Sequence, residues 1–232
     1  MRRLDIVLWL LLVWLLSACS SPRSWVYAPE ARQSRSPVVS ASLVVPPFID
    51  RRSNENTNAV FLYLIPLMPF GYQSMSVPES TSLHVSSGLW QTRPADDFAR
   101  AIAQEIDAAR IFSEAFTDSR SSSGEFVLSG EIRSMQFDAK MLSYCLSVYG
   151  PLLWFIGFPA SHTSNELELQ LTLTRRDGGS PLWRYTIRGS DSQTGWLYAM
   201  GTDFMYDRLL KAAIPAALSS LEGAMRGVVA TQ

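Results

Sequence analysis

Residues 166–174 read ELELQLTLT, and this stretch decides the fold. Leucine occupies every second position from 167 to 173, and polar side chains fill the positions between. Successive side chains of a β-strand point to opposite faces, so the alternation predicts a strand with one face packed and the other in water. The turn sequence DGG follows at 177–179, and apolar residues alternate again over 183–188. Residues 166–188 are therefore expected to form a β-hairpin.

The rest of the chain places more strands and two helices around this hairpin. Alternation and flanking turn residues predict strands at 40–45, 111–116 and 126–137. Residues 94–110 carry Phe98, Ile102 and Ile106 at helical spacing, and residues 202–226 show a second apolar stripe of that period. The order predicts an α+β fold. We expect a mostly antiparallel sheet with two main helices packed on it, in a single domain with apolar loop insertions.

The N-terminus has the pattern of an export signal. Arg2 and Arg3 precede an unbroken run of 11 apolar residues at 6–16. A membrane-spanning helix needs about 20 apolar residues, whereas the apolar core of a secretory signal needs about 7 to 15. Residues 1–18 are therefore expected to be a signal peptide.

Leu16-Ser17-Ala18-Cys19 closes this signal and resembles the lipobox of bacterial lipoproteins. The resemblance implies that Cys19 is diacylated and becomes the first residue of the mature protein, and two acyl chains suffice for stable membrane anchoring. In that family an Asp after the cysteine favours the inner membrane, so Ser20 implies the outer membrane. An ordinary signal peptide cleaved after Ala18 and an uncleaved anchor are the alternatives.

Three parts of the chain follow from this assignment. After the signal peptide at 1–18, residues 19–39 are rich in Ser, Pro and Arg and are expected to form a lipidated, flexible tether. Residues 40–232 are the predicted periplasmic domain, in which Cys145 is expected to be buried. The order of elements is similar to that of the small α/β domains of periplasmic assembly proteins, such as the N-terminal domain of the Tol-system translocation protein, the curli-secretion lipoprotein and the lipoproteins that activate penicillin-binding proteins.

Composition and motifs argue against several function classes. A net charge of −1, from 20 basic and 21 acidic residues, lacks the basic field of a nucleic-acid binder. The sequence contains no G-x-S-x-G, H-E-x-x-H, Walker A, G-x-G-x-x-G or C-x-x-C motif. The two histidines, His84 and His162, are expected in loops and are too few for a histidine-rich metal cluster. We therefore expect no catalytic residues, no metal and no cofactor.

Two uncharged, aromatic segments interrupted by Pro and Gly lie outside the predicted regular elements. One spans residues 59–72 and the other spans residues 141–165. Exposed apolar patches on a soluble domain mark contacts with proteins or membranes, and Trp and Tyr suit the membrane interface. The predicted contact residues, for a partner or for the membrane, are Tyr149, Trp154, Phe155, Phe158, Phe61, Tyr63 and Phe70.

Several interpretations of these segments stay open at this point. The two segments could pack on each other and on the sheet as core. If they are exposed, the sequence favours a non-enzymatic outer-membrane lipoprotein that is a docking or accessory subunit of a cell-envelope assembly, with an envelope protein as partner. The alternative is a periplasmic carrier of a lipid or another hydrophobic ligand, and a hydrolase of envelope polymers comes third.

Overall fold

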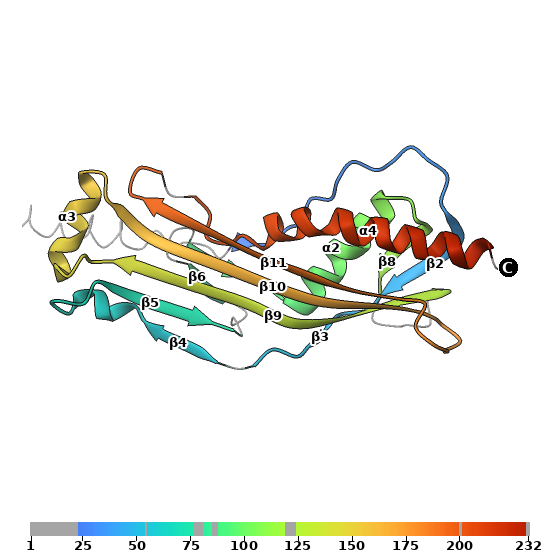
Figure 1. Ribbon diagram of the computed structural model, residues 1–232, viewed down its shortest axis with the longest axis horizontal. Coiled ribbons are helices and arrows are strands. Elements are labelled where there is room, and N and C mark those ends of the chain that lie inside the picture. The colour runs from blue at the N-terminus through green and yellow to red at the C-terminus, as the bar shows by residue number, and fades with distance from the viewer. Residues whose placement is uncertain are drawn as a thin grey trace, which may run out of the picture.

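The computed structural model describes residues 23–53, 55–76, 81–84, 88–118, 124–199 and 201–230, with 81–84 described by backbone alone. The predicted signal peptide and Cys19 lie outside these residues. The domain is elongated, with two long helices at one end and the short helix α3 (Gly150–Phe155) at the other (Figure 1). The predicted α+β class is confirmed, because a mostly antiparallel sheet carries two main helices on one face.

Three long antiparallel strands run along the molecule. They are β9 (Phe126–Leu142), β10 (Pro159–Arg175) and β11 (Trp183–Trp196). The central strand, β10, pairs with β9 on one side and β11 on the other. The alternating leucines at 167–173 lie in β10 and are all buried, which confirms the predicted hairpin. Both of its strands extend beyond the predicted residues.

Shorter strands lie on the other side of β9. The 8-stranded sheet is completed by β2 (Val39–Val45), β3 (Ile49–Asp50), β4 (Asn56–Ala59), β5 (Phe70–Met75) and β8 (Phe112–Thr117). Of these, β2, β3 and β5 pair with β9, β8 pairs with β2, and β4 pairs with β5. A second, 3-stranded sheet consists of β1 (Arg23–Ser24), β6 (Thr81–His84) and β7 (Gly88–Gln91). The predicted strands at 40–45 and 111–116 are confirmed as β2 and β8. The expectation that both histidines lie in loops is wrong, since His84 is in β6 and His162 in β10.

A bulge keeps the packed face of β9 continuous. Glu168 of β10 pairs with Ser134 and Leu169 pairs with Ile132, so Arg133 is the extra residue on β9. An inserted residue shifts the alternation of a strand by one position. As a result, Ile132 and Met135 both lie on the buried side.

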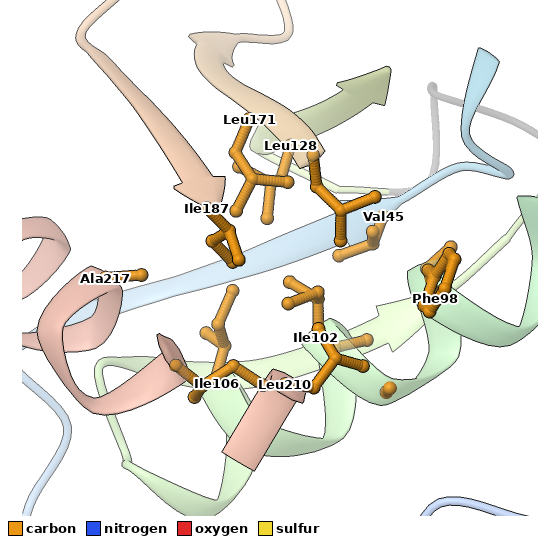
Figure 2. Close-up of a cluster of buried hydrophobic side chains, with 14 of the residues drawn as sticks. Val45, Phe98, Ile102, Ile106, Leu128, Leu171, Ile187, Leu210 and Ala217 are labelled. Carbon is orange, nitrogen blue, oxygen red and sulfur yellow. The ribbon is translucent and has the colours of Figure 1, made fainter. Parts of the chain in front are cut away.

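The two long helices cover the half of the sheet nearest β2. They are α2 (Pro94–Ala108) and α4 (Tyr206–Ala230), and they confirm the two predicted helices. Figure 2 shows the core between them and the sheet, with labelled residues Val45, Phe98, Ile102, Ile106, Leu128, Leu171, Ile187, Leu210 and Ala217. The start of α4 is fixed by the buried Asn165 of β10, whose amide donates to the Asp203 carbonyl at 3.0 Å and accepts from the Met205 N–H at 3.2 Å.

Residues 25–38 form a strap that lies against the helices, so the expected flexible tether is wrong for this part of the chain. The strap contributes two buried aromatic residues, Trp25 and Tyr27. The Tyr27 hydroxyl donates to the buried Glu105 carboxylate of α2 at 2.6 Å, and the strap backbone donates to the end of α2 from Gln33. These aromatic contacts outweigh the disorder expected from the Ser, Pro and Arg content.

Arg35 ties the strap to both helices. Its guanidinium donates to the Ala109 carbonyl at the end of α2 and forms two hydrogen bonds with Glu222 of α4, at 2.7 and 3.0 Å. Arg226 adds a third hydrogen bond to the same carboxylate, at 2.6 Å. The hydrogen bonds from Arg35 and then from Arg226 lower the pKa of Glu222 below its ordinary value of 4.5.

This pKa shift predicts acid sensitivity of the strap. A carboxyl group with a lowered folded-state pKa contributes its full stability above the ordinary value, and the contribution is lost as the pH falls through the folded-state pKa. Glu222→Gln is expected to reduce the free energy of unfolding at neutral pH by less than about 1 kcal/mol, and the difference from the unaltered protein should shrink as the pH falls below 4.5. Urea unfolding of both proteins across this pH range measures the difference. If the free energies of unfolding of the two proteins keep a constant difference down to acid pH, Glu222 does not stabilise the strap through its charge.

Candidate functional site

An apolar tip closes the end of the molecule opposite the C-terminus of α4. We define the tip as residues 60–70, 143–158 and 196–199. It contains the 3-10 helices η1 (Val60–Leu64) and η3 (Ser147–Tyr149) together with α3. Helix α3 lies beyond the ends of β9 and β10, at the limit of the long axis (Figure 1). The three segments are far apart in sequence, and they are brought together because β5 and β10 flank the last third of β9 and because Trp196 of β11 pairs with Pro159 of β10.

Backbone hydrogen bonds join the first two segments of the tip. The amides of Ser143 and Tyr144 both donate to the Pro69 carbonyl, at 2.9 and 3.0 Å, and the Leu67 amide donates to the Cys145 carbonyl at 3.2 Å. The Ser143 hydroxyl donates to the Met68 carbonyl at 2.6 Å. One part of the core interpretation is therefore correct, because the two segments do pack on each other.

The apolar side chains of the tip nevertheless face outward. Leu67 is 82% exposed, Phe155 60% and Tyr198 75%. Outside the tip, the large apolar side chains that are exposed among the described residues are Val26, Ile49, Tyr72 and Val229. The exposed ones within the tip are Phe61, Leu64, Ile65, Leu67, Leu146, Val148, Tyr149, Leu152, Phe155, Ile156, Phe158, Trp196 and Tyr198. The tip is thus the main exposed apolar surface of the described chain.

All seven contact residues predicted from the sequence lie in the tip. Four are exposed, namely Phe61, Tyr149, Phe155 and Phe158. The other three, Tyr63, Phe70 and Trp154, are half-buried. The Trp154 indole donates to the Leu142 carbonyl at 3.0 Å, so this residue supports the tip from inside.

Sequence reasoning missed part of the surface and misplaced one residue. Trp196, the last residue of β11, and Tyr198 belong to the tip, and neither was predicted as a contact residue. The signal that could have found them is the absence of charge from residue 192 to residue 202. Cys145 is exposed rather than buried, and it stands in a left-handed backbone conformation with φ of 64°.

Two glycines allow the tip segments to approach their supports closely. A Cβ atom on Gly71 of β5 would lie 1.9 Å from the Val60 carbonyl oxygen. The lack of a Cβ atom there allows η1 to pack directly on the strand. A Cβ atom on Gly150 would lie 2.4 Å from the Ser143 carbonyl oxygen, so glycine at this position allows α3 to pack against the end of β9. The tip is therefore held in place by backbone packing as well as by hydrogen bonds.

Charge is sparse around the tip. Lys140 lies at its base, with the ammonium group 5.0 Å from the centroid of the Phe70 ring. Tyr144 donates its hydroxyl proton to the Pro159 carbonyl at 2.6 Å, and burial raises the pKa of this hydroxyl. The hydroxyl therefore stays protonated as a donor at neutral pH.

The strongest alternative site is a cleft between the strap and the two long helices. Its volume is about 360 Å³, and Glu105, Lys211 and Glu222 line it. Two of its carboxylates are already engaged, because Glu105 accepts from Tyr27 and Glu222 accepts from Arg35. In the described part of the chain, no group of three His, Cys, Asp or Glu residues is placed to hold a metal ion. No helix of that part is long and apolar enough to cross a membrane.

Comparisons with known proteins add little to this description. No protein-family model matches the chain, and no curated protein matches it. Among solved structures, the chain is similar to protein XCC0632 from Xanthomonas campestris, whose crystal structure is described under the family model DUF330. The identity is 12%, the match covers 90% of this chain and 93% of that chain, and the TM-score is 0.40. A likeness of this degree carries no argument about function.

Proposed function

We propose that this protein is a non-enzymatic lipoprotein of the cell outer membrane whose periplasmic domain is a docking or accessory subunit of a cell-envelope assembly. Acyl chains on Cys19 hold it to the membrane, and the apolar tip is the surface through which the domain engages the envelope. The observation that carries the proposal is the concentration of exposed apolar side chains at one end of the domain. Such a surface on a soluble domain marks a contact with a protein or a membrane.

The way the tip is built supports a contact role. Exposed apolar side chains cost free energy in water. Hydrogen bonds and close backbone packing nevertheless hold those of the tip at the surface. Four non-glycine residues of the tip adopt left-handed φ angles, namely Leu67, Tyr144, Cys145 and Ser147, and Arg110 is the remaining one in the described chain. Strained backbone tends to cluster at functional sites, where the surrounding structure holds it.

The natural thiol of Cys145 provides the test. In the purified protein this exposed thiol is expected to react readily with a maleimide reagent, whereas in native envelopes the occupied tip should protect it. A matched control moves the thiol to the opposite end, in Cys145→Ser with Val229→Cys, where labelling should be equal in both preparations. If Cys145 reacts equally in envelopes and in purified protein, the tip engages nothing and the proposal fails.

A second experiment tests the lipid anchor on Cys19 and the presence of an envelope partner. Cys19→Ala is expected to release the protein from the membrane fraction, and a protein that stays bound would contradict lipid anchoring. Crosslinking in native membranes, purification and mass spectrometry should then recover an envelope protein that the Cys19→Ala control loses. A stoichiometric lipid with no protein partner would instead favour the carrier.

A further inference from the structure

We propose that the apolar tip docks on a lipid surface, by entering the headgroup region of an anionic bilayer. This inference rests on the proposed function, since it names what the tip engages. The occupant of an exposed apolar surface is decided by three properties of the surface: its charge, the direction of its hydrogen-bonding groups and its depth.

Charge favours a membrane over a protein. The chain carries no Lys, Arg, Asp or Glu in residues 56–76, 141–165 and 192–202, and these three stretches contain the whole tip. The rim of a protein interface is polar, whereas an interfacial membrane surface is uncharged with basic side chains at its edge. Lys140 is such an edge residue: it is exposed, and its ammonium group lies over the Phe70 ring. A lysine stem can lie along apolar surface while its ammonium group reaches the lipid phosphates.

Four polar side chains of the tip are directed inward. Ser143 donates to the Met68 carbonyl, Tyr144 to the Pro159 carbonyl and Trp154 to the Leu142 carbonyl. The Ser147 hydroxyl likewise donates to the Leu64 carbonyl. A protein interface presents about one hydrogen bond per 100–200 Å² to its partner, whereas lipid requires polar groups to be satisfied within the protein. These four donors are satisfied by carbonyl groups of the protein itself, which matches a lipid environment.

The depth of the uncharged cap matches interfacial insertion. Lys140 pairs with His162 in the sheet, three residues after the start of β10 at Pro159. That distance is about 10 Å along a strand, and α3 lies beyond it. Interfacial elements bury their apolar face roughly 5–10 Å into the boundary between headgroups and acyl chains. Trp196 pairs with Pro159 at this level, where indole rings favour the headgroups.

The test uses a probe that reports on the tip alone. The full chain with Cys19→Ser has Cys145 as its single thiol, because the sequence contains 2 cysteines. A bimane fluorophore on Cys145 is followed as vesicles of equal parts phosphatidylcholine and phosphatidylglycerol are added. We expect a blue shift and quenching by lipids brominated near the headgroup. The N-terminal apolar run is common to all variants, so it cannot produce differences between them.

Leu67→Asp is the matched tip variant. Leu67 is 82% exposed and has φ of 69°, a conformation that Asp adopts more readily than Leu, so the fold is expected to persist. The lipid concentration for half of the blue shift should rise about tenfold or more, since a Leu side chain that docking would bury in the bilayer is replaced by a charge. The control Val229→Asp, at the other end of the molecule, should leave it unchanged.

The outcomes separate this inference from the proposed function. A probe that stays in water with vesicles, in a protein whose Cys145 is protected in native envelopes, would overturn lipid docking and indicate a protein partner. A blue shift already present before vesicles are added, with co-purified lipid, would indicate a carrier and also overturn it. Equal vesicle responses of Leu67→Asp and Val229→Asp would overturn it as well.

Discussion

Gly71→Ala is expected to lower the free energy of unfolding by about 3 kcal/mol, the upper end of the usual cost of overpacking. The added Cβ atom would lie 1.9 Å from the Val60 carbonyl oxygen and 2.9 Å from the Tyr63 nitrogen. Both neighbours are backbone atoms, so no side-chain rotation can relieve the clash, and η1 must leave its seat on β5. Urea unfolding followed by far-UV circular dichroism measures the loss.

Gly223→Ala is the matched control for this prediction. Gly223 lies within α4, and nothing stands within 4 Å of the position of an added Cβ atom. Ala is favoured over Gly in a helix interior by about 1 kcal/mol, so this variant should be as stable as the unaltered protein or more so. If Gly71→Ala and Gly223→Ala unfold at the same urea concentration, η1 is not seated on β5 as described.

Local patterns were sufficient to predict the two main helices and strands within β2, β8, β9, β10 and β11, but they predicted neither β3 to β7 nor the pairing of several strands with β9. The alternation in 166–174 is set by neighbouring residues, and so are the apolar stripes of the two helices. The pairing of β2, β3 and β5 along one edge of β9 depends on contacts between residues distant in sequence. The bulge at Arg133 also changes the phase of the alternation between Ile132 and Met135, inside the predicted strand at 126–137.

The composition of the tip was predictable, whereas its architecture was not. Lack of charge and abundance of aromatic residues identified two of its segments and all seven predicted residues. The hydrogen bonds from Ser143 and Tyr144 to Pro69 join backbone groups more than 70 residues apart, and no local pattern encodes them. The exposure of these residues also depends on the sheet face that the helices leave uncovered. Sequence alone therefore left the core and interface interpretations open.

The strap limits the distance between the domain and a lipid anchor on Cys19. Five residues lie between Cys19 and Trp25, the first buried residue of the strap, so the chain from Cys19 to Trp25 spans at most about 20 Å. If the chain were free as far as Val39, the span would reach about 70 Å. A lipid on Cys19 would therefore hold the domain close to the membrane only while Trp25 is packed.

Trp25→Ala is expected to lower the free energy of unfolding by about 3–5 kcal/mol and to free the strap. The Trp25 ring is buried and contacts the rings of Tyr27, Phe98 and Phe204 at centroid distances of 6.0, 5.3 and 5.9 Å. Its removal leaves a cavity beside α2 and loosens Tyr27 from Glu105. Urea unfolding measures the stability, and limited proteolysis within residues 28–38 reports on release of the strap.

Trp25→Phe separates packing from hydrogen bonding in this prediction. The buried Trp25 indole nitrogen has no acceptor among the described residues, so Phe forfeits no hydrogen bond there and keeps most of the ring contacts. Its loss of stability should be well below that of Trp25→Ala, and its strap should resist the protease. If Trp25→Ala instead unfolds like the unaltered protein and its strap stays resistant, then Arg35 and Tyr27 hold the strap without the indole. In that case the short reach of the anchor would not depend on Trp25.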